Sequence, residues 1–269
     1  MRKTLGGRQP SEGFLSHGAV RDGNALVSKD GVAAWWLLLE HLTEGDLEML
    51  EALLVDEELA RADRFHFERD RQIYIAAHGI CRGLLSYHLG QPAKNWRFSI
   101  EDHGKPELIS PAGGPRIRVN ISHTRGLAAV ALTSEHDIGV DVEWRHRDAM
   151  VDELAQRMFA ESERRDVQRA CKEKKLDIFL AYWTLKEAYV KAIGKGLSQP
   201  LDAFEFDLNG LNITFLDRSA DDPDQWHFER YQPGPDHLMA LAVRHPAKAN
   251  LRVEAGPAPM EFLRNLAQA

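Results

Sequence analysis

The sequence is poor in cysteine and in long apolar stretches. Its 269 residues include only two cysteines, Cys81 and Cys171, which exclude a disulfide framework and a cysteine-rich metal site. Two isolated thiols are typical of a reducing compartment. The longest apolar run covers residues 32–39 and is too short to span a bilayer, and residues 1–30 have no apolar segment of the signal-peptide kind. We therefore expect a cytoplasmic protein with no membrane partner.

Three catalytic signatures are missing as well. The chain has no Walker-type glycine loop, no Rossmann fingerprint and no His-Glu-x-x-His pattern, despite its twelve histidines. These absences argue against a P-loop enzyme, a dinucleotide-binding domain and a zinc metalloprotease. The net charge of −7 argues against a nucleic-acid partner.

The residues that are present predict a mixture of strands and helices. Apolar residues make up 43% of the chain, enough for one large domain or two small ones. Period-two and helical spacings of apolar residues distinguish the two kinds of element. Strands are expected at 33–39, 117–122, 127–133, 138–143, 203–216, 226–231 and 238–243. Helices are expected at 43–59, 57–89, over most of 150–182, at 183–193 and at 260–266.

Residues 183–193 form the helix around which the remaining motifs are arranged. Trp183, Glu187 and Lys191 are spaced i, i+4, i+8 and so share one face, and Gly194 suits the C-terminal cap. The ordinary interpretation of Glu187 and Lys191 is a surface ion pair. Trp183 is interpreted as a core aromatic residue.

An acidic strand is predicted upstream, at Ile138–Glu143. Alternation turns Asp141 and Glu143 to one face, together with Gly139, which we interpret as leaving room for a bulky anion. Two carboxylates on one face make half of a site for a hard divalent cation, and Glu187 could complete it. The alternative is an edge strand with a solvated acidic face.

A third motif, Asn120-Ile-Ser122-His123, ends the strand before it. Small polar side chains, a histidine and a glycine-containing turn offer hydrogen-bond donors to a phosphate, although an ordinary hairpin turn would look similar.

Four motifs in order connect these pieces to a known family. They are Gly104-Lys105-Pro106, the Asn120–His123 turn, the Ile138–Glu143 strand and the Trp183–Lys191 helix. In this order and at these separations the chain resembles the 4′-phosphopantetheinyl transferases of the Sfp type, over roughly residues 32 to 245.

The resemblance implies an α+β fold built from two pseudo-symmetric α+β subdomains, with the cofactor in the cleft between them. We expect these subdomains at 32–135 and 136–249, a flexible extension at 1–31 and a C-terminal tail at 250–269 without an assigned role. No internal sequence repeat is evident, so the symmetry follows from the resemblance alone. A monomer is expected.

The implied reaction is the Mg²⁺-dependent transfer of the phosphopantetheine arm of coenzyme A to a serine of an apo acyl or peptidyl carrier protein. Adenosine 3′,5′-bisphosphate would be the second product. The carrier could belong to fatty acid, polyketide or nonribosomal peptide synthesis. The alternatives are a catalytically dead module that binds coenzyme A or the carrier, and a Mg²⁺-dependent nucleotide hydrolase.

The resemblance also implies roles for individual residues. Asp141, Glu143 and Glu187 would bind Mg²⁺ or Mn²⁺. Glu187 is the first choice of general base, with Asp141 or a hydroxide on the metal as alternatives, and Lys191 would contact the pyrophosphate and steady or protonate the departing oxygen. The expected coenzyme-binding residues are Arg61, Lys105, Asn120, Ser122, His123, Glu187 and Lys191, of which Arg61 and Lys105 would reach the 3′-phosphate.

Two further features carry weaker expectations. Many relatives have an arginine where this chain has His78. The expectation of a second cationic contact to the coenzyme from that helix is therefore weaker than the expectation for Arg61. The stretch 164–175 is the most basic part of the chain and is either a solvated face or a docking surface for an acidic carrier protein.

Overall fold

The computed structural model describes residues 29–100, 106–109, 116–146, 150–217 and 221–268. The predicted N-terminal extension up to residue 28, and Lys105 with its loop, lie outside the described residues. Within the described parts, no helix has the length and apolar character needed to cross a membrane. Cys81 is buried, Cys171 is exposed, and neither forms a disulfide.

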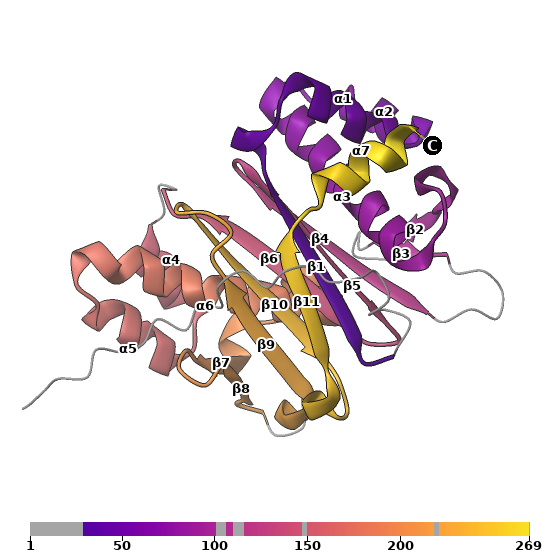
Figure 1. The fold of residues 1–269 in the computed structure, drawn as a ribbon. Coiled ribbons are helices and arrows are strands. Elements are labelled where there is room, and N and C mark those ends of the chain that lie inside the picture. Colours follow the sequence, from indigo (N-terminus) through magenta and orange to yellow (C-terminus); the bar gives the residue numbers. More distant parts are fainter. Residues whose placement is uncertain (1–28, 101–105, 110–115, 147–149, 218–220, 269) are drawn as a thin grey trace, which may run out of the picture.

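The first half of the molecule is a four-stranded sheet covered by a long helix (Figure 1). Its strand order is β11-β1-β5-β4, and only the β1–β11 pair is parallel. The long helix α3 packs on one face of the sheet, together with the short helices α1 and α2 and the C-terminal α7. The elements are β1 (Gly31–Leu38), α1 (Glu44–Ala52), α2 (Asp56–Ala62), α3 (Glu68–Leu89), β2 (Phe98–Ile100), β3 (Pro106–Leu108), β4 (Ile117–Thr124), β5 (Leu127–Ser134), β11 (Arg252–Pro257) and α7 (Met260–Gln268).

The second half is a three-stranded antiparallel sheet of order β6-β10-β9, packed against the long helix α6. The helices α4 and α5 and the hairpin β7–β8 complete this layer (Figure 1). The elements are β6 (Ile138–Trp144), α4 (Val151–Met158), α5 (Glu161–Arg169), α6 (Lys172–Ile193), β7 (Phe204–Asp207), β8 (Asn212–Phe215), β9 (Trp226–Tyr231) and β10 (His237–Arg244).

The two halves repeat one topology. Each runs strand, 22-residue helix, strand, strand, and each places its last strand between the other two, as β1-β5-β4 and β6-β10-β9. Both long helices end at a glycine with φ of 70°, Gly90 after α3 and Gly194 after α6, a conformation that glycine adopts without steric cost. The pseudo-symmetric α+β fold implied by the family resemblance is therefore confirmed, and Gly194 caps its helix as predicted.

Three apolar clusters hold the layers together. One lies beneath α1, α3 and α7, one beneath α4 to α6, and one between the two sheets. The alternation predicted for β6 is confirmed, because Ile138, Val140 and Val142 belong to the cluster between the sheets. Gly139, Asp141 and Glu143 consequently point toward α6.

Several segments differ from the expectation. The helix expected at 57–89 is interrupted between α2 and α3, the strand expected at 203–216 is the hairpin β7–β8, and the helix expected at 183–193 is the second half of α6. The continuous helix expected over 43–59 is two helices, α1 and α2, separated at residues 53–55, although Thr43 and Asp46 form the expected N-terminal capping box. The tail is more than a terminal helix. Its first part is β11, which pairs with β1, and α7 is held to α1 by Arg264, which donates to Asp46 at 2.7 Å. The tail thus completes the first half.

Candidate active site

Three of the sequence motifs meet where α6 crosses β6. A β-carbon at Gly139 would lie 2.0 Å from the main-chain oxygen of Ala188 and 2.5 Å from the nitrogen of Ala192. The helix backbone therefore occupies the space that a side chain would need. Our interpretation of Gly139 as room for an anion is wrong, because that room is filled by α6.

A cluster of three polar side chains lies beside this contact. Lys191 Nζ of α6 lies 2.6 Å from Asp141 Oδ1 of β6 and donates to Ser122 Oγ of β4 at 2.8 Å. Ser122 Oγ also lies 3.3 Å from Asp141 Oδ1. Asp141 is 6% exposed and the Lys191 side chain 29% exposed, so the ion pair reaches solvent only on the lysine side.

Asn120 and Ser122 lie at the seam between the halves. Asn120 Oδ1 accepts the main-chain N–H of Val140 at 2.8 Å, and Ser122 Oγ accepts that of Val142 at 3.3 Å. The Asn120 side chain is buried. Its observed bond is a structural one, and a contact between Asn120 and coenzyme stays a prediction that this geometry does not favour.

The acidic residues face one another across the seam of α6 and β6. Burial raises the pKa of Asp141 above its ordinary value, although Lys191 and Ser122 oppose the shift. The pKa of Glu187 is also raised, first by burial and then by the negative charges of Asp141 and Glu143, against which Lys191 acts. Three negative charges held near one another repel, and a bound cation would reduce this repulsion.

The carboxylate oxygens of this cluster are the kind of ligand that a hard divalent cation prefers. Asp141 Oδ2 is buried and has no hydrogen-bond partner in the described structure, so one carboxylate oxygen is available as a ligand. In the arrangement described, however, no group of three or more His, Cys, Asp and Glu side chains converges closely enough to hold a metal ion. The three-carboxylate ligand set therefore stays a prediction.

His123 lies on the other face of β4. Ile121, two residues earlier, packs against the cluster beneath α3, and side chains two apart share a face. His123 is exposed, and its pKa is lowered by loss of hydration and then by the positive charges of Lys191 and His78. A neutral imidazole there can donate or accept one hydrogen bond at each ring nitrogen.

Arg61 is connected to His78 through an aromatic ring. The Arg61 guanidinium lies 5.8 Å from the centroid of the Tyr74 ring, and that ring stacks on His78 with centroids 4.0 Å apart. His78 Nδ1 is in turn 3.3 Å from Glu58 Oε1. Arg61 of α2 therefore lies beside Tyr74 and His78 of α3.

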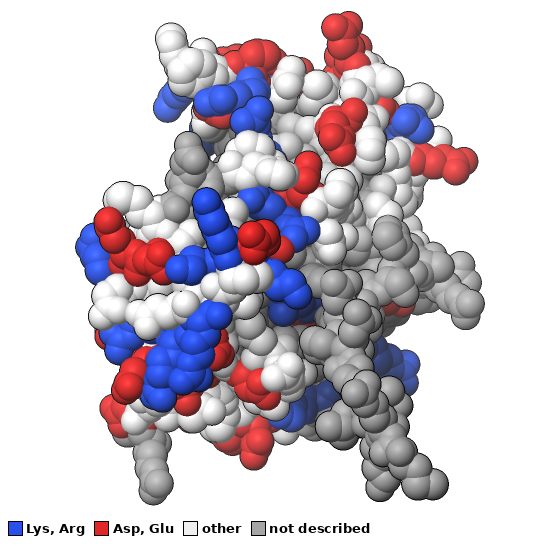
Figure 2. Space-filling model, turned by 90° about the vertical axis from the view of Figure 1, so that its left-hand side faces the viewer, with Lys and Arg blue, Asp and Glu red and all other residues white. Residues whose placement is uncertain are grey.

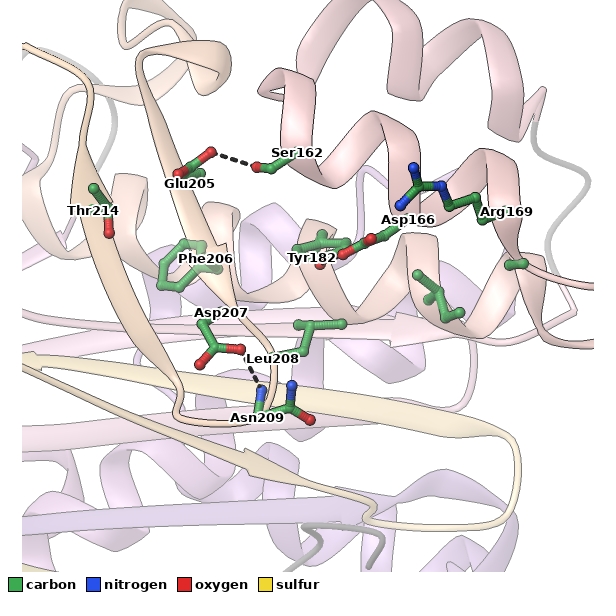
Figure 3. A pocket seen from close by; sticks show the side chains of 12 residues that line it. Ser162, Asp166, Arg169, Tyr182, Glu205, Phe206, Asp207, Leu208, Asn209 and Thr214 are labelled. Atoms are coloured by element: carbon green, nitrogen blue, oxygen red, sulfur yellow. Dashed lines mark hydrogen bonds between the residues drawn. The ribbon is translucent and has the colours of Figure 1, made fainter. Parts of the chain in front are cut away.

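A pocket lies away from this cluster. Its volume is about 600 Å³, and it opens between α5, α6 and the β7–β8 hairpin (Figure 3). None of Asp141, Glu187 and Lys191 lines it. Within it Tyr182 donates to Asp166 at 2.6 Å, and Ser162 donates to Glu205.

The basic stretch forms a mixed surface. Figure 2 shows Lys and Arg side chains interspersed with Asp and Glu on the side of the molecule that carries α4 and α5. Arg165 lies 3.1 Å from Glu161, and Lys175 lies 2.9 Å from Asp152. Arg169 is exposed at the rim of the pocket in Figure 3.

The structure thus brings Ser122, Asp141 and Lys191 into contact, with Glu187 and Glu143 in electrostatic range. Trp183 stacks on Phe179 with centroids 5.6 Å apart, which fits the core role expected for it. Sequence reasoning missed Lys186, whose side chain is completely buried. Its signal was a lysine at a core position of α6, four residues after Tyr182 and three before Tyr189.

Comparisons with known proteins agree with this architecture. Residues 137–242 match the family model described as the 4′-phosphopantetheinyl transferase superfamily. Residues 42–135 match the model described as 4′-phosphopantetheinyl transferase, N-terminal. The two matches meet at the turn between β5 and β6, where one repeat of the fold ends and the next begins.

Whole-chain relatives show the same family. The chain is 35% identical to 4′-phosphopantetheinyl transferase HetI of Nostoc sp. over 220 residues, which cover 82% of this chain and 90% of HetI. It is 27% identical to 4′-phosphopantetheinyl transferase Sfp of Bacillus subtilis, over 76% of this chain and 88% of Sfp. It is 30% identical to the human L-aminoadipate-semialdehyde dehydrogenase-phosphopantetheinyl transferase, over 71% of this chain and 67% of that protein. This chain belongs to the 4′-phosphopantetheinyl transferase superfamily and is an enzyme of that family.

Proposed function

We propose that this protein transfers the 4′-phosphopantetheine arm of coenzyme A to a serine hydroxyl of an apo acyl or peptidyl carrier protein and requires a divalent cation, Mg²⁺ or Mn²⁺. The serine oxygen forms a bond to the β-phosphorus of the coenzyme. The bond between that phosphorus and the bridging oxygen breaks, and adenosine 3′,5′-bisphosphate leaves. The observation that carries the proposal is the contact of Lys191 with Asp141 and Ser122 beside the raised-pKa carboxyl of Glu187.

Lys191 supplies the positive charge of the site. Its ammonium contacts Asp141 Oδ1 and Ser122 Oγ and is partly exposed, so a pyrophosphate oxygen arriving from the solvent side would meet its positive charge. There it would neutralise the charge that develops on the departing oxygen. Phosphoryl transfer depends on such positioning and charge neutralisation more than on covalent participation of the protein.

Glu187 is the proposed general base. A serine hydroxyl is a weak nucleophile at neutral pH and needs a proton acceptor. Burial and the neighbouring charges raise the pKa of Glu187, which makes its ionised form a stronger acceptor than an ordinary carboxylate. The proton of the carrier serine would pass to a Glu187 carboxylate oxygen. Asp141 is the alternative acceptor, but its Oδ1 is already bonded to Lys191.

The carboxylates Asp141, Glu143 and Glu187 would hold the divalent cation, with Asp141 Oδ2 as the oxygen that lacks a partner in the described structure. When bound, the cation would withdraw charge from the pyrophosphate. It would also relieve the mutual repulsion of the three carboxylates.

The coenzyme phosphates are proposed to lie on the α3 side of the seam, which carries His123 and Arg61. His123, whose pKa is lowered by loss of hydration and then by Lys191 and His78, would donate a hydrogen bond to a phosphate oxygen, and Arg61 would reach the 3′-phosphate region. The exposed arginines of α5 are the proposed docking surface for an acidic carrier protein.

The deciding experiment is mass spectrometry of an apo carrier protein incubated with coenzyme A, Mg²⁺ and this protein. A gain of one phosphopantetheine on serine is expected, together with release of adenosine 3′,5′-bisphosphate. Tight coenzyme A binding without transfer would support a non-catalytic binding module instead. Hydrolysis of coenzyme A without a carrier would support a hydrolase. The variant Glu187→Gln should fold normally and transfer nothing measurable.

A further inference from the structure

Lys186 is a buried charge directly next to Glu187. Its side chain is 0% exposed, and its Nζ lies 2.8 Å from Glu163 Oε2. It also donates hydrogen bonds to the main-chain oxygens of Leu201 at 2.7 Å and Phe204 at 2.6 Å. An ammonium carries three protons, so these three oxygens use its full donor capacity.

The partner of Lys186 is equally fixed. Glu163 belongs to α5 and is also 0% exposed. Its Oε1 accepts the main-chain N–H of Phe206 at 2.9 Å, and its Oε2 accepts that of Ala160 at 3.0 Å. Through this ion pair and its hydrogen bonds, α6 is joined to α5 and to residues 201–206, which lead into β7. The rings of Phe204 and Phe159 close over the ammonium, with their centroids 4.4 and 5.6 Å from Nζ.

Packing alone does not make this connection. The pocket of Figure 3 opens between α5 and the β7–β8 hairpin, and Ser162 and Phe206, which adjoin the pair, line it. The pair lies between this pocket and the apolar cluster beneath α4 to α6, and its hydrogen bonds join α5 and the start of β7 to α6 in addition to the packing of that cluster.

The contact of α6 with β6, on another side of the helix, is where the position of α6 matters for the proposed site. Gly139 lets the helix backbone lie directly against β6. On that side Glu187 faces Asp141 and Glu143, and like charges repel one another. The ion pair of Lys191 with Asp141, one turn further along, draws α6 toward β6, whereas the repulsion between Glu187 and the two carboxylates opposes this approach. Lys186 points to another side of the turn that carries Glu187 and anchors that turn to α5.

We propose that the buried Lys186–Glu163 pair is a positioning device for the catalytic helix: it fixes the turn of α6 that carries Glu187, and so sets the separation between Glu187 and Asp141 on which cation and coenzyme binding depend. This inference rests on the proposed function. Lys186 touches neither substrate nor cation and acts through the main chain of Glu187.

The test uses three variants of the full chain, Lys186→Met, Glu163→Gln and the two combined, with Lys94→Met as a matched exposed lysine in the first half. For each protein, thermal unfolding is followed by circular dichroism. Mg²⁺ binding is measured by calorimetry on protein saturated with coenzyme A. The kcat for transfer and the KM values for coenzyme A and carrier are then compared.

Lys186→Met leaves the buried Glu163 carboxylate without its cation, and Glu163→Gln leaves the buried Lys186 ammonium without its anion. A lower melting temperature is therefore expected for both single variants. The double variant leaves no unpaired charge and should melt above both single variants. It should melt below the wild type, because the main-chain oxygens of Leu201 and Phe204 lose their donor. We expect its Mg²⁺ affinity to fall by about tenfold or more, the effect typical of groups that orient metal ligands. Its kcat should fall as well, with KM for the carrier unchanged, and Lys94→Met should match the wild type.

Two results would overturn the proposal. A folded double variant with wild-type Mg²⁺ affinity and kcat would make the pair dispensable for positioning. A double variant that does not fold would make it a folding element only. If the wild type itself transfers no phosphopantetheine, the proposed function fails, whereas the Mg²⁺ calorimetry still reports on the pair.

Discussion

Asn120 of β4 and Val140 of β6 form a hydrogen bond that joins the two halves of the molecule, with Asn120 Oδ1 accepting the Val140 N–H at 2.8 Å. Ser122 repeats the arrangement two residues further on, with Val142 as donor. The edge strands β4 and β6 belong to different sheets, and side chains supply acceptors that a backbone ladder would otherwise provide. The same side of β4 therefore builds the seam and, at Ser122, the proposed active site.

The first prediction separates these roles. Asn120→Ala leaves the buried N–H of Val140 without its acceptor, which should lower the free energy of unfolding by about 1–3 kcal/mol. The KM for coenzyme A should not change. Urea unfolding and steady-state kinetics measure both quantities, and Asn212→Ala, at an exposed asparagine on β8, is the near-neutral control. A raised KM at unchanged stability would return Asn120 to the coenzyme site.

The second prediction concerns Gly139. In Gly139→Ala the new methyl group would meet the main chain of Ala188 and Ala192, which a helix cannot relieve by rotating a side chain. The helix must move away from β6 and carry Glu187 and Lys191 with it. A small shift of a positioned catalytic group can lower the rate about a hundredfold, so we expect a loss of that order in kcat. The melting temperature should fall as well.

The control for this change is another glycine in open space. At Gly45 in α1 the nearest atom to an added β-carbon is Thr43 Oγ1 at 4.0 Å, and alanine is the better helix former by about 0.5–1 kcal/mol. Gly45→Ala should therefore be neutral or stabilising and fully active. Wild-type transfer by Gly139→Ala would show that the close approach of α6 is not required.

The parts of the fold that follow from short-range rules were predictable from the sequence. Alternation placed Asp141 and Glu143 on one strand face, helical spacing placed Glu187 and Lys191 on one helix face, and Gly194 marked the helix end. Each of these depends on residues a few positions apart. The four ordered motifs then supplied the family and with it the paired halves.

Other features depend on partners distant in the chain and gave no local signal. The strand β11 exists because it pairs with β1 from the far end of the sequence. Gly139 was assigned to an anion because a strand sequence does not reveal which backbone will approach it. Lys186 was passed over because its acceptors come from two separate segments, α5 and residues 201–204, which only the folded chain brings together.

The third prediction is a pH-dependent gain of stability in Glu187→Gln. The folded-state pKa of Glu187 is raised above its unfolded value, so ionisation is more costly in the folded protein. The wild type therefore loses stability as pH rises from the unfolded pKa through the folded one, and below both values the carboxyl is protonated in either state. Without metal, the variant should be more stable at neutral pH by on the order of 1 kcal/mol, and this advantage should vanish in acid.

Urea unfolding in chelator across this pH range measures the difference. With saturating Mg²⁺ and coenzyme A the wild type should become the more stable of the two proteins at neutral pH, because it gains binding energy that the variant loses. Equal stabilities at every pH in chelator would show that Glu187 does not face the charges of Asp141 and Glu143.

The fourth prediction tests the surface of α5. Arg165 and Arg169 are exposed, and Arg165 pairs with Glu161 of the same helix. If an acidic carrier docks there, Arg165→Glu with Arg169→Glu should reduce kcat/KM for the carrier by about tenfold or more at low salt, since opposite charges accelerate encounter by that order. The dependence of this constant on salt should weaken as well, while kcat at saturating carrier and KM for coenzyme A stay unchanged. Arg252→Glu, at an exposed position on β11 in the other half, is the matched charge reversal and should behave like the wild type. A change confined to KM for coenzyme A would move these arginines from the carrier surface to the coenzyme site.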